Sequence, residues 1–151
     1  MEVIKILSAL LTPVIALLAL YIAYQQYHIN KINLKKELYD KRLRIYQRIN
    51  QYLINIIANG TVKREEIYSF YNDTIEVTFL FKNDIISIRD ELYNKSLEFN
   101  KYNRMINGEI KVDEETRKKA IDKDGEIFQW FNEQFDRVKN LFSKYLSVTI
   151  N

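Results

Sequence analysis

The chain has 151 residues, no cysteine and one histidine, and its formal net charge is +3. Without cysteine it has no disulfide framework, and one histidine cannot build an imidazole-rich metal site within one chain. A Ser-His-Asp triad would have to use His28. Three glycines and one proline leave little turn chemistry, whereas a sheet-rich fold needs many turns, so the composition favours an all-α fold without a resident cofactor or metal.

An uncharged apolar run extends from Ile6 to Tyr24. As a helix, its 19 positions cover roughly 28 Å, close to the ~30 Å hydrocarbon core of a bilayer. We therefore predict an N-terminal transmembrane helix in residues 1–26 that continues into a cytoplasmic helical domain, residues 27–151. The length of this second part suits one ordinary domain with its own core.

The charges beside the run predict its orientation. Lys5 alone flanks its N-terminal side, whereas seven basic side chains follow it in residues 27–48. The positive-inside rule then places the N-terminus outside and the body in the cytoplasm, with the chain in the cytoplasmic membrane. A secretory signal peptide is the alternative, but its apolar core is shorter, at ~7 to 15 residues, and exported sequence rather than a dense basic segment follows it.

Small residues line one face of the predicted span at spacings of four, four, three and four. Small side chains let helices approach closely and hydroxyls bond across an interface, so this face predicts a homo-oligomer, although alanine is also common in such helices for no special reason. Proline interrupts helix hydrogen bonding and is expected to bend the span. In a pore this face would line the lumen. The predicted face comprises Ser8, Thr12, Pro13, Ala16, Ala19 and Ala23.

Aromatic residues mark the C-terminal end of the span. Tyr21, Tyr24 and Tyr27 match the aromatic girdle of a membrane interface. His28 lies beside them at the predicted headgroup level, which favours a structural role over pH sensing or catalysis.

Basic residues dominate the next segment. Residues 27–48 carry seven basic and two acidic side chains, a net +5, whereas residues 49–151 carry 15 basic and 17 acidic ones. Lysines and arginines beside a span attract anionic headgroups, at roughly 1 kcal/mol each near the surface. The arginines have three further alternatives: ion pairs within the bundle, an anionic ligand such as a nucleotide, and RNA, against which the slightly acidic remainder argues. The predicted contacts are Lys31, Lys35, Lys36, Lys41, Arg42, Arg44 and Arg48.

Apolar periodicity predicts four helical segments. The first continues from the span as a stalk, residues 27–58, and ends at Asn59-Gly60. Its expected core positions are Ile45, Ile49, Tyr52, Leu53 and Ile56. The second is capped by Thr61, and its expected core positions are Ile67, Phe70, Tyr71, Ile75, Phe79 and Leu80. Residues 74–81 also favour a strand because their β-propensity is high, which leaves that alternative open.

The third and fourth segments have clearer boundaries. The third begins at Asn83 or Asp84 and ends near Asn107-Gly108, with Ile85, Ile88, Leu92, Leu97 and Met105 as core positions. The fourth begins after Asp113, a good N-cap, and its expected stripe is Ile121, Phe128, Phe131, Phe135, Val138, Phe142 and Tyr145, widened by Trp130 and Leu141. Antiparallel packing of the four segments predicts a helical bundle.

Catalytic motifs are scarce in the sequence. Carboxylates do lie at helical spacing, as in Glu133 with Asp136 and Asp122 with Glu126, but nearby basic residues favour ordinary surface ion pairs. The three glycines are too far apart to cradle a phosphate. The Arg…His pair of HEPN ribonucleases does not occur, because no histidine follows Lys31. We therefore expect no enzymatic activity and keep a cryptic nuclease only as a third alternative.

Residues 11–49, LTPVIALLALYIAYQQYHINKINLKKELYDKRLRIYQRI, and residues 127–146, IFQWFNEQFDRVKNLFSKYL, resemble a widespread group of small bacterial membrane proteins with one N-terminal span and a helical cytoplasmic domain. This resemblance implies the inner membrane of a bacterium and brings no assigned reaction. The architecture alone is similar to small membrane effectors of phage defence. These include the accessory membrane protein of type VI-B CRISPR systems, which resembles a divergent HEPN bundle and forms a pore. No motif residue carries across from that protein.

Two functions follow as hypotheses. The first is a non-enzymatic membrane protein that oligomerises and forms a pore or perturbs the membrane in bacterial defence or stress response. The alternative is a membrane-anchored adaptor whose cytoplasmic bundle binds a protein partner or an anionic ligand. The bilayer with its anionic headgroups is a partner in both.

Overall fold

In a computed structural model, the chain divides into two units, residues 1–38 and residues 39–151. The structure describes the backbone of residues 2–147, and the side chains of Lys5 and of residues 11–147. Five helices follow in chain order: α1 (Glu2–Asn59), α2 (Arg64–Asp73), α3 (Val77–Leu80), α4 (Asn83–Ile106) and α5 (Glu114–Leu146). The described part of the chain contains no strand, which confirms the all-α prediction.

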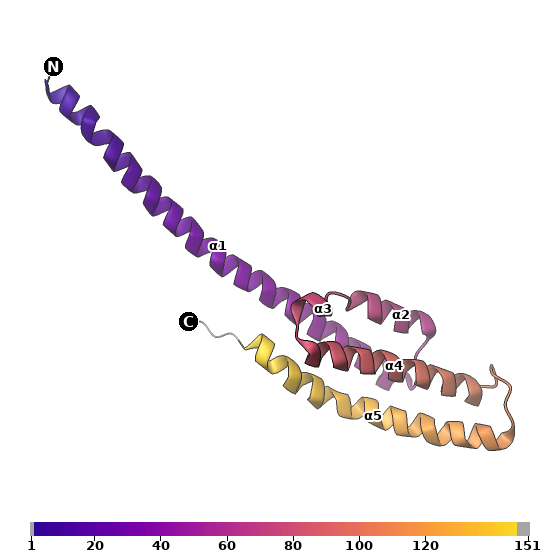
Figure 1. The fold of residues 1–151 in the computed structure, drawn as a ribbon. Coiled ribbons are helices and arrows are strands. Elements are labelled where there is room, and N and C mark those ends of the chain that lie inside the picture. Colours follow the sequence, from indigo (N-terminus) through magenta and orange to yellow (C-terminus); the bar gives the residue numbers. More distant parts are fainter. Residues whose placement is uncertain (1, 148–151) are drawn as a thin grey trace. The chain divides into compact units, whose positions relative to one another are not determined.

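The second unit is a helical bundle. Figure 1 shows α4 and α5 side by side, and their contacts establish that they are antiparallel, because Arg137 binds Glu91 near the middle of α4 while Asp124 binds Asn103 near its end. The C-terminal part of α1 also contacts α5, since the rings of Tyr46 and Phe142 lie 5.3 Å apart. The predicted bundle is therefore confirmed.

Large aromatic and aliphatic side chains fill the bundle core. Phe99 of α4 meets Phe131 of α5 edge to face, with ring centroids 5.6 Å apart. The predicted core positions of α1 are all buried, and α1 ends as expected where Gly60 adopts a φ of 63°, a left-handed conformation that glycine tolerates best. The largest fully buried side chains are Phe99, Phe131, Phe142, Ile49, Leu53, Ile56, Ile67, Ile85, Ile88 and Leu92.

The second predicted segment differs most from the structure. Helix α2 begins after Lys63 rather than after Thr61, because the Glu66 carboxylate accepts the Lys63 backbone N–H at 2.7 Å. The helix then stops at Asp73, and the buried Thr74 hydroxyl donates to the Phe70 carbonyl at 2.7 Å. Residues 74–76 form a turn before α3, so the strand alternative for residues 74–81 is wrong.

This turn changes which apolar residues enter the core. Val77 is buried, whereas Ile75 is 53% exposed and Phe79 is 87% exposed. The prediction of Ile75 and Phe79 as core positions is therefore wrong, because it assumed one uninterrupted helical register from Ile67 to Leu80. Tyr68, Ile75 and Phe79 therefore form an exposed apolar edge along α2, the turn and α3.

The ends of α4 and α5 follow the sequence closely. Gly108, with a φ of 78°, follows α4, and the Asp113 carboxylate caps α5 by accepting the Thr116 N–H at 2.7 Å. The stripe of α5 is partly shifted by one residue, since Ala120 and Ile127 are buried while Ile121 is half exposed. Phe131, Val138 and Phe142 are buried as predicted, and Phe128, Phe135 and Tyr145 are half-buried at its margins.

A polar contact joins the start of α4 to the end of α5. Asp84 accepts hydrogen bonds from the Tyr145 hydroxyl at 2.8 Å and from the Ile85 N–H at 2.9 Å, and it pairs with Lys144. Burial raises the pKa of Asp84, but the hydrogen bonds from Lys144, Tyr145 and Ile85 outweigh this effect and lower the pKa below its usual value. The ionised carboxylate therefore stabilises the fold.

This contact predicts a pH dependence. Because the pKa of Asp84 is lower in the folded state, its contribution is fully present above the unfolded value of about 3.9 and is lost as pH falls through the folded value. Asp84→Asn should lower the free energy of unfolding by about 1 kcal/mol at pH 7, and by less at pH 3. Thermal unfolding of the full chain in detergent at both pH values measures this. Equal losses at pH 7 and pH 3 would contradict it, and the exposed Asp122→Asn is the matched control.

Candidate functional site

The described members of the predicted small-residue face lie on α1 within residues 1–38. Thr12, Ala16, Ala19 and Ala23 are all exposed to solvent. The Ser8 side chain lies outside the described residues. Pro13 lies inside α1, as expected for a proline within the predicted span. The structure thus leaves this face available for contact with another helix or with lipid.

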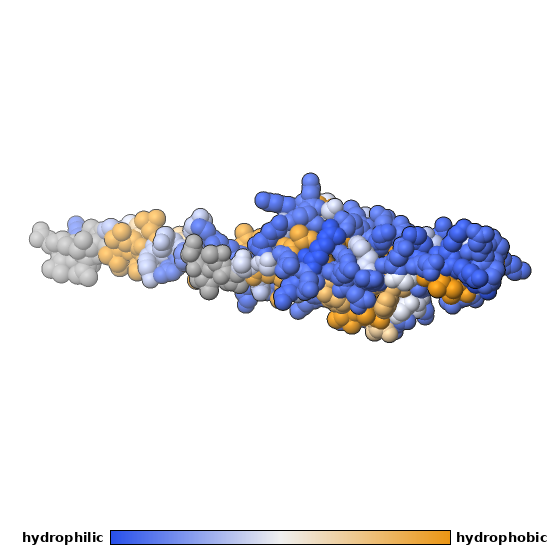
Figure 2. All heavy atoms as spheres, turned by 90° about the horizontal axis from the view of Figure 1, so that it is seen from below, coloured by the Kyte–Doolittle hydropathy of each residue, from blue (hydrophilic) through white to orange (hydrophobic). Residues whose placement is uncertain are grey.

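Large apolar side chains surround the small ones without protein cover. Leu11, Leu17 and Leu20 are each at least 60% exposed, and Figure 2 shows this part of α1 as a hydrophobic patch beside the grey atoms. Burying one leucine side chain is worth roughly 1.5 to 3 kcal/mol, so covering these residues would be favourable. Among the residues whose side chains the structure describes, no helix has an apolar stretch long enough to cross a membrane; the side chains of residues 6–10 of the predicted span are not among them.

The predicted interfacial aromatic residues are exposed as well. Tyr21 accepts a hydrogen bond from the Gln25 side chain at 2.9 Å. The rings of Tyr24 and His28 are nearly parallel, with centroids 6.4 Å apart. These contacts within one helix suit a structural role for His28.

The seven predicted basic contacts fall into two groups. Lys31, Lys35 and Lys36 are exposed in the first unit, and Arg44 is exposed in the second. The remaining side chains are at least partly engaged in the bundle. Arg48 pairs with Asp73 of α2 at 3.0 Å, which is the ion-pair alternative.

Arg42 is held by α3 and α5. Its Nε donates to the Leu80 carbonyl at 3.2 Å, and its guanidinium lies 5.8 Å from the Phe81 ring centroid and 5.4 Å from that of Tyr145. Cation–π contacts of this kind contribute to packing. Arg42 is therefore a structural residue of the bundle, and Lys41 beside it also makes an interaction.

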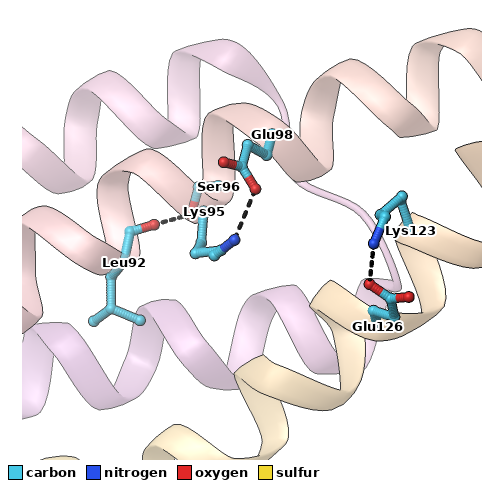
Figure 3. Close-up of polar contacts among 6 residues, drawn as sticks. All are labelled: Leu92, Lys95, Ser96, Glu98, Lys123 and Glu126. Atoms are coloured by element: carbon cyan, nitrogen blue, oxygen red, sulfur yellow. Dashed lines mark hydrogen bonds and ion pairs between the residues drawn. The ribbon is translucent and has the colours of Figure 1, made fainter.

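The carboxylates at helical spacing are surface residues. Figure 3 shows Lys123 paired with Glu126 on α5 at 2.6 Å, and Lys95 paired with Glu98 on α4 at 2.8 Å. Across the described residues no group of three His, Asp or Glu side chains converges as a metal site would require. The predicted surface ion pair is confirmed for Glu126.

A buried arginine is the main polar feature that the sequence prediction missed. Arg89 is 4% exposed, its Nε lies 2.6 Å from the Asp90 carboxylate, and its guanidinium carbon lies 4.5 Å from the Tyr71 ring centroid. Its Nη1 has no hydrogen-bond partner among the described residues. Its spacing from Ile85 and Leu92 places it on the core side of α4, which is the signal that could have identified it.

A buried hydroxyl pair links α1 to α4. The Tyr52 hydroxyl donates to Ser96 Oγ at 2.7 Å, and Ser96 donates to the Leu92 carbonyl at 2.7 Å, a bond drawn in Figure 3. Burial raises the pKa of Tyr52 far above its usual value, so its hydroxyl stays protonated. With every proton already donated within the protein, this pair supports packing rather than acid–base chemistry.

A cleft in the second unit has a volume of about 500 Å³. It lies between the N-terminal turn of α2 and the C-terminal part of α4, and its polar groups largely bind one another. Arg104 binds Glu109 at 3.0 Å, Asn100 donates to the Val62 carbonyl at 2.8 Å, and Asn103 binds Asp124. Burial raises the pKa of Asp124, an effect that the Asn103 hydrogen bond opposes. The cleft offers amides and paired charges, without a nucleophile activated by a base.

The fold and these sites define an all-α protein with a helical bundle and an uncovered apolar helix. No family model, curated protein or solved structure matches the chain.

Proposed function

We propose that the chain is a non-enzymatic single-pass membrane protein. The observation that carries the proposal is the uncovered apolar part of α1, followed by exposed tyrosines and then by exposed lysines. This order of apolar, aromatic and basic side chains is the order of the layers from the bilayer core to the headgroups. The proposed location is the inner membrane of a bacterium, with residues 39–151 in the cytoplasm.

The length of the apolar run decides whether it can span. Residues 11–24 give 14 positions, or about 21 Å of helix, which is short of a ~30 Å hydrocarbon core. The run in the sequence begins at Ile6, and its 19 positions give roughly 28 Å. We therefore place residues 6–24 in the bilayer.

The bundle then serves as a cytoplasmic adaptor. Its apolar edge supports this role, because Tyr68, Ile75 and Phe79 stay exposed although the neighbouring residues of α2 and α3 pack into the core. Exposed tyrosine and phenylalanine side chains are typical contact residues in protein interfaces. A cytoplasmic protein fits this edge better than a nucleotide, since two of the arginines predicted to bind an anion already have partners in the bundle.

Alkaline extraction tests the membrane proposal. Membranes from cells that express the full chain are washed at high pH, which releases peripheral proteins and leaves spanning proteins in the pellet. The chain should stay in the pellet. Its quantitative release into the supernatant would contradict a span.

An oligomeric pore is the second candidate function, in line with the architecture of the phage-defence effectors. The exposed small-residue face around Thr12 and Ala16 favours it, because a hydroxyl offers water a polar partner inside a lumen. Leakage of a dye from liposomes that contain the purified chain distinguishes the two functions. A pore releases the dye, whereas an adaptor leaves it trapped.

The small-residue face also predicts an effect on assembly. Ala16→Leu should lower the oligomeric state in detergent, because a large side chain at the centre of the face holds two helix backbones apart. Mass measurement by light scattering reports the change, and Leu17→Ala, which removes bulk beside the face, is the control. If Thr12→Leu combined with Ala16→Leu leaves the mass unaltered, the face is not an interface.

A further inference from the structure

We propose that the cleft between α2 and α4 binds a small phosphorylated molecule that also carries a hydroxyl or amino group, such as a mononucleotide or a sugar phosphate. The phosphate lies at the N-terminus of α2, and the hydroxyl or amino group donates a hydrogen bond to Asn103 of α4. All residues that line the cleft belong to the second unit, so this site is independent of the membrane anchor and of the apolar edge.

The N-terminus of α2 supplies donors for an anion. Helix α2 has ten residues, and Lys63 at its N-cap has no side-chain oxygen that could accept the N–H groups of the first turn. Free N–H groups at a helix N-terminus, together with the helix dipole, favour a phosphate. The position of this terminus is fixed against α4, because the Asn100 side chain donates to the Val62 carbonyl at 2.8 Å.

The charges of the cleft also favour an anion. Three basic and two acidic side chains line it. Arg104 donates from Nε to Glu109 at 3.0 Å, so this pair is neutral, whereas Lys63 and Arg64 face the single carboxylate of Glu65. Arg64 is exposed and forms no ion pair with another residue that the structure describes. Its guanidinium is therefore available for a phosphate.

Asn103 points independently to a ligand. It lines the cleft and is only 8% exposed. Its Nδ2 donates to the Asp124 carboxylate, but its buried Oδ1 has no hydrogen-bond partner among the described residues. A buried acceptor without a donor is unfavourable, so a ligand gains affinity by supplying one. The acceptor therefore selects a hydroxyl or amino group in addition to the phosphate.

The size and lining of the cleft suit such a molecule. Its volume of about 500 Å³ lies within the range of about 300 to 1,000 Å³ that is usual for small-molecule sites. Apart from Val62, its lining residues are polar or charged. The cleft therefore fits a polar, hydroxyl-bearing phosphate better than an apolar compound.

Calorimetric titration of the full chain in detergent tests the ligand class. The probes are adenosine 5′-monophosphate, ribose 5-phosphate, adenosine and sodium sulfate. At least one of the two phosphates should bind, and the one that binds more tightly identifies the source of the phosphate. Adenosine, which has no anionic group, and sulfate, which has no donor at neutral pH, should each bind at least about tenfold more weakly.

Two variants with matched controls test the residues. Arg64→Gln should weaken phosphate binding about tenfold, whereas Arg44→Gln, an equally exposed arginine on α1, should leave it unchanged. Asn103→Ala should weaken binding several-fold. Asp124→Ala breaks the same Asn103 hydrogen bond but keeps the Oδ1 acceptor, so it should retain binding.

The contrary outcomes are distinct. Absence of binding by both phosphates, in a chain that still unfolds cooperatively on heating, overturns the site. Equal affinity for adenosine and its monophosphate overturns the phosphate, and equal affinity for sulfate and the organic phosphates overturns the donor. Equal losses from Arg64→Gln and Arg44→Gln, or from Asn103→Ala and Asp124→Ala, overturn the placement of the ligand in this cleft.

Discussion

Replacing Phe131 by alanine is expected to lower the free energy of unfolding of the bundle by about 3 to 5 kcal/mol. Phe131 has no exposed surface, and its ring meets those of Phe99 at 5.6 Å and Trp130 at 5.2 Å, so the change leaves a cavity where α4 and α5 pack. For a bundle of this size the melting temperature should fall by roughly 10 °C or more. Thermal unfolding of the full chain in detergent, followed by near-ultraviolet circular dichroism, measures the shift.

Phe79→Ala is the matched control for this experiment. It removes the same side chain from the exposed edge of α3, where the loss should stay within about 0.5 kcal/mol. Comparable shifts from the two variants would contradict the described core.

Leu17→Asp should remove most of the chain from the membrane fraction. A charged side chain near the centre of a span costs about 2.5 to 3.5 kcal/mol on insertion scales, which is a large penalty for a span that already contains one proline, one serine and one threonine. The fraction of chain retained after alkaline extraction reports the change.

Leu34→Asp is the control for position. Leu34 is as exposed as Leu17, but it lies beyond the predicted span among the lysines, so its replacement should leave membrane retention unchanged. Equal retention of the two variants would indicate that the apolar run does not cross the membrane.

The sequence predicts the helices well where local signals and burial agree. The stop at Gly60, the cap at Asp113 and the core side of α1 all follow from residue type and spacing. The turn at residues 74–76 does not follow, because the Thr74 hydroxyl bond that ends α2 is one of several that a threonine can make. The apolar edge at Ile75 and Phe79 arises from that turn.

The candidate sites are predictable to a lesser degree. The order of apolar, aromatic and basic residues on α1 can be predicted from the sequence, because the side chains of residues 11–38 are exposed and do not depend on partners far along the chain. The structural roles of Arg42 and Arg48 could not be predicted, because their partners lie far along the chain, within residues 73–145. The burial of Arg89 likewise depends on the placement of Tyr71, whose ring lies beneath its guanidinium.

Cysteine accessibility in intact cells would show whether the chain crosses the membrane. Lys5→Cys and Lys139→Cys place single thiols on the two sides of the apolar run, in a chain without other cysteines. A membrane-impermeant maleimide should label Lys5→Cys from outside spheroplasts and should label Lys139→Cys only after permeabilisation. Labelling of both thiols only after permeabilisation would show that the chain does not cross the membrane.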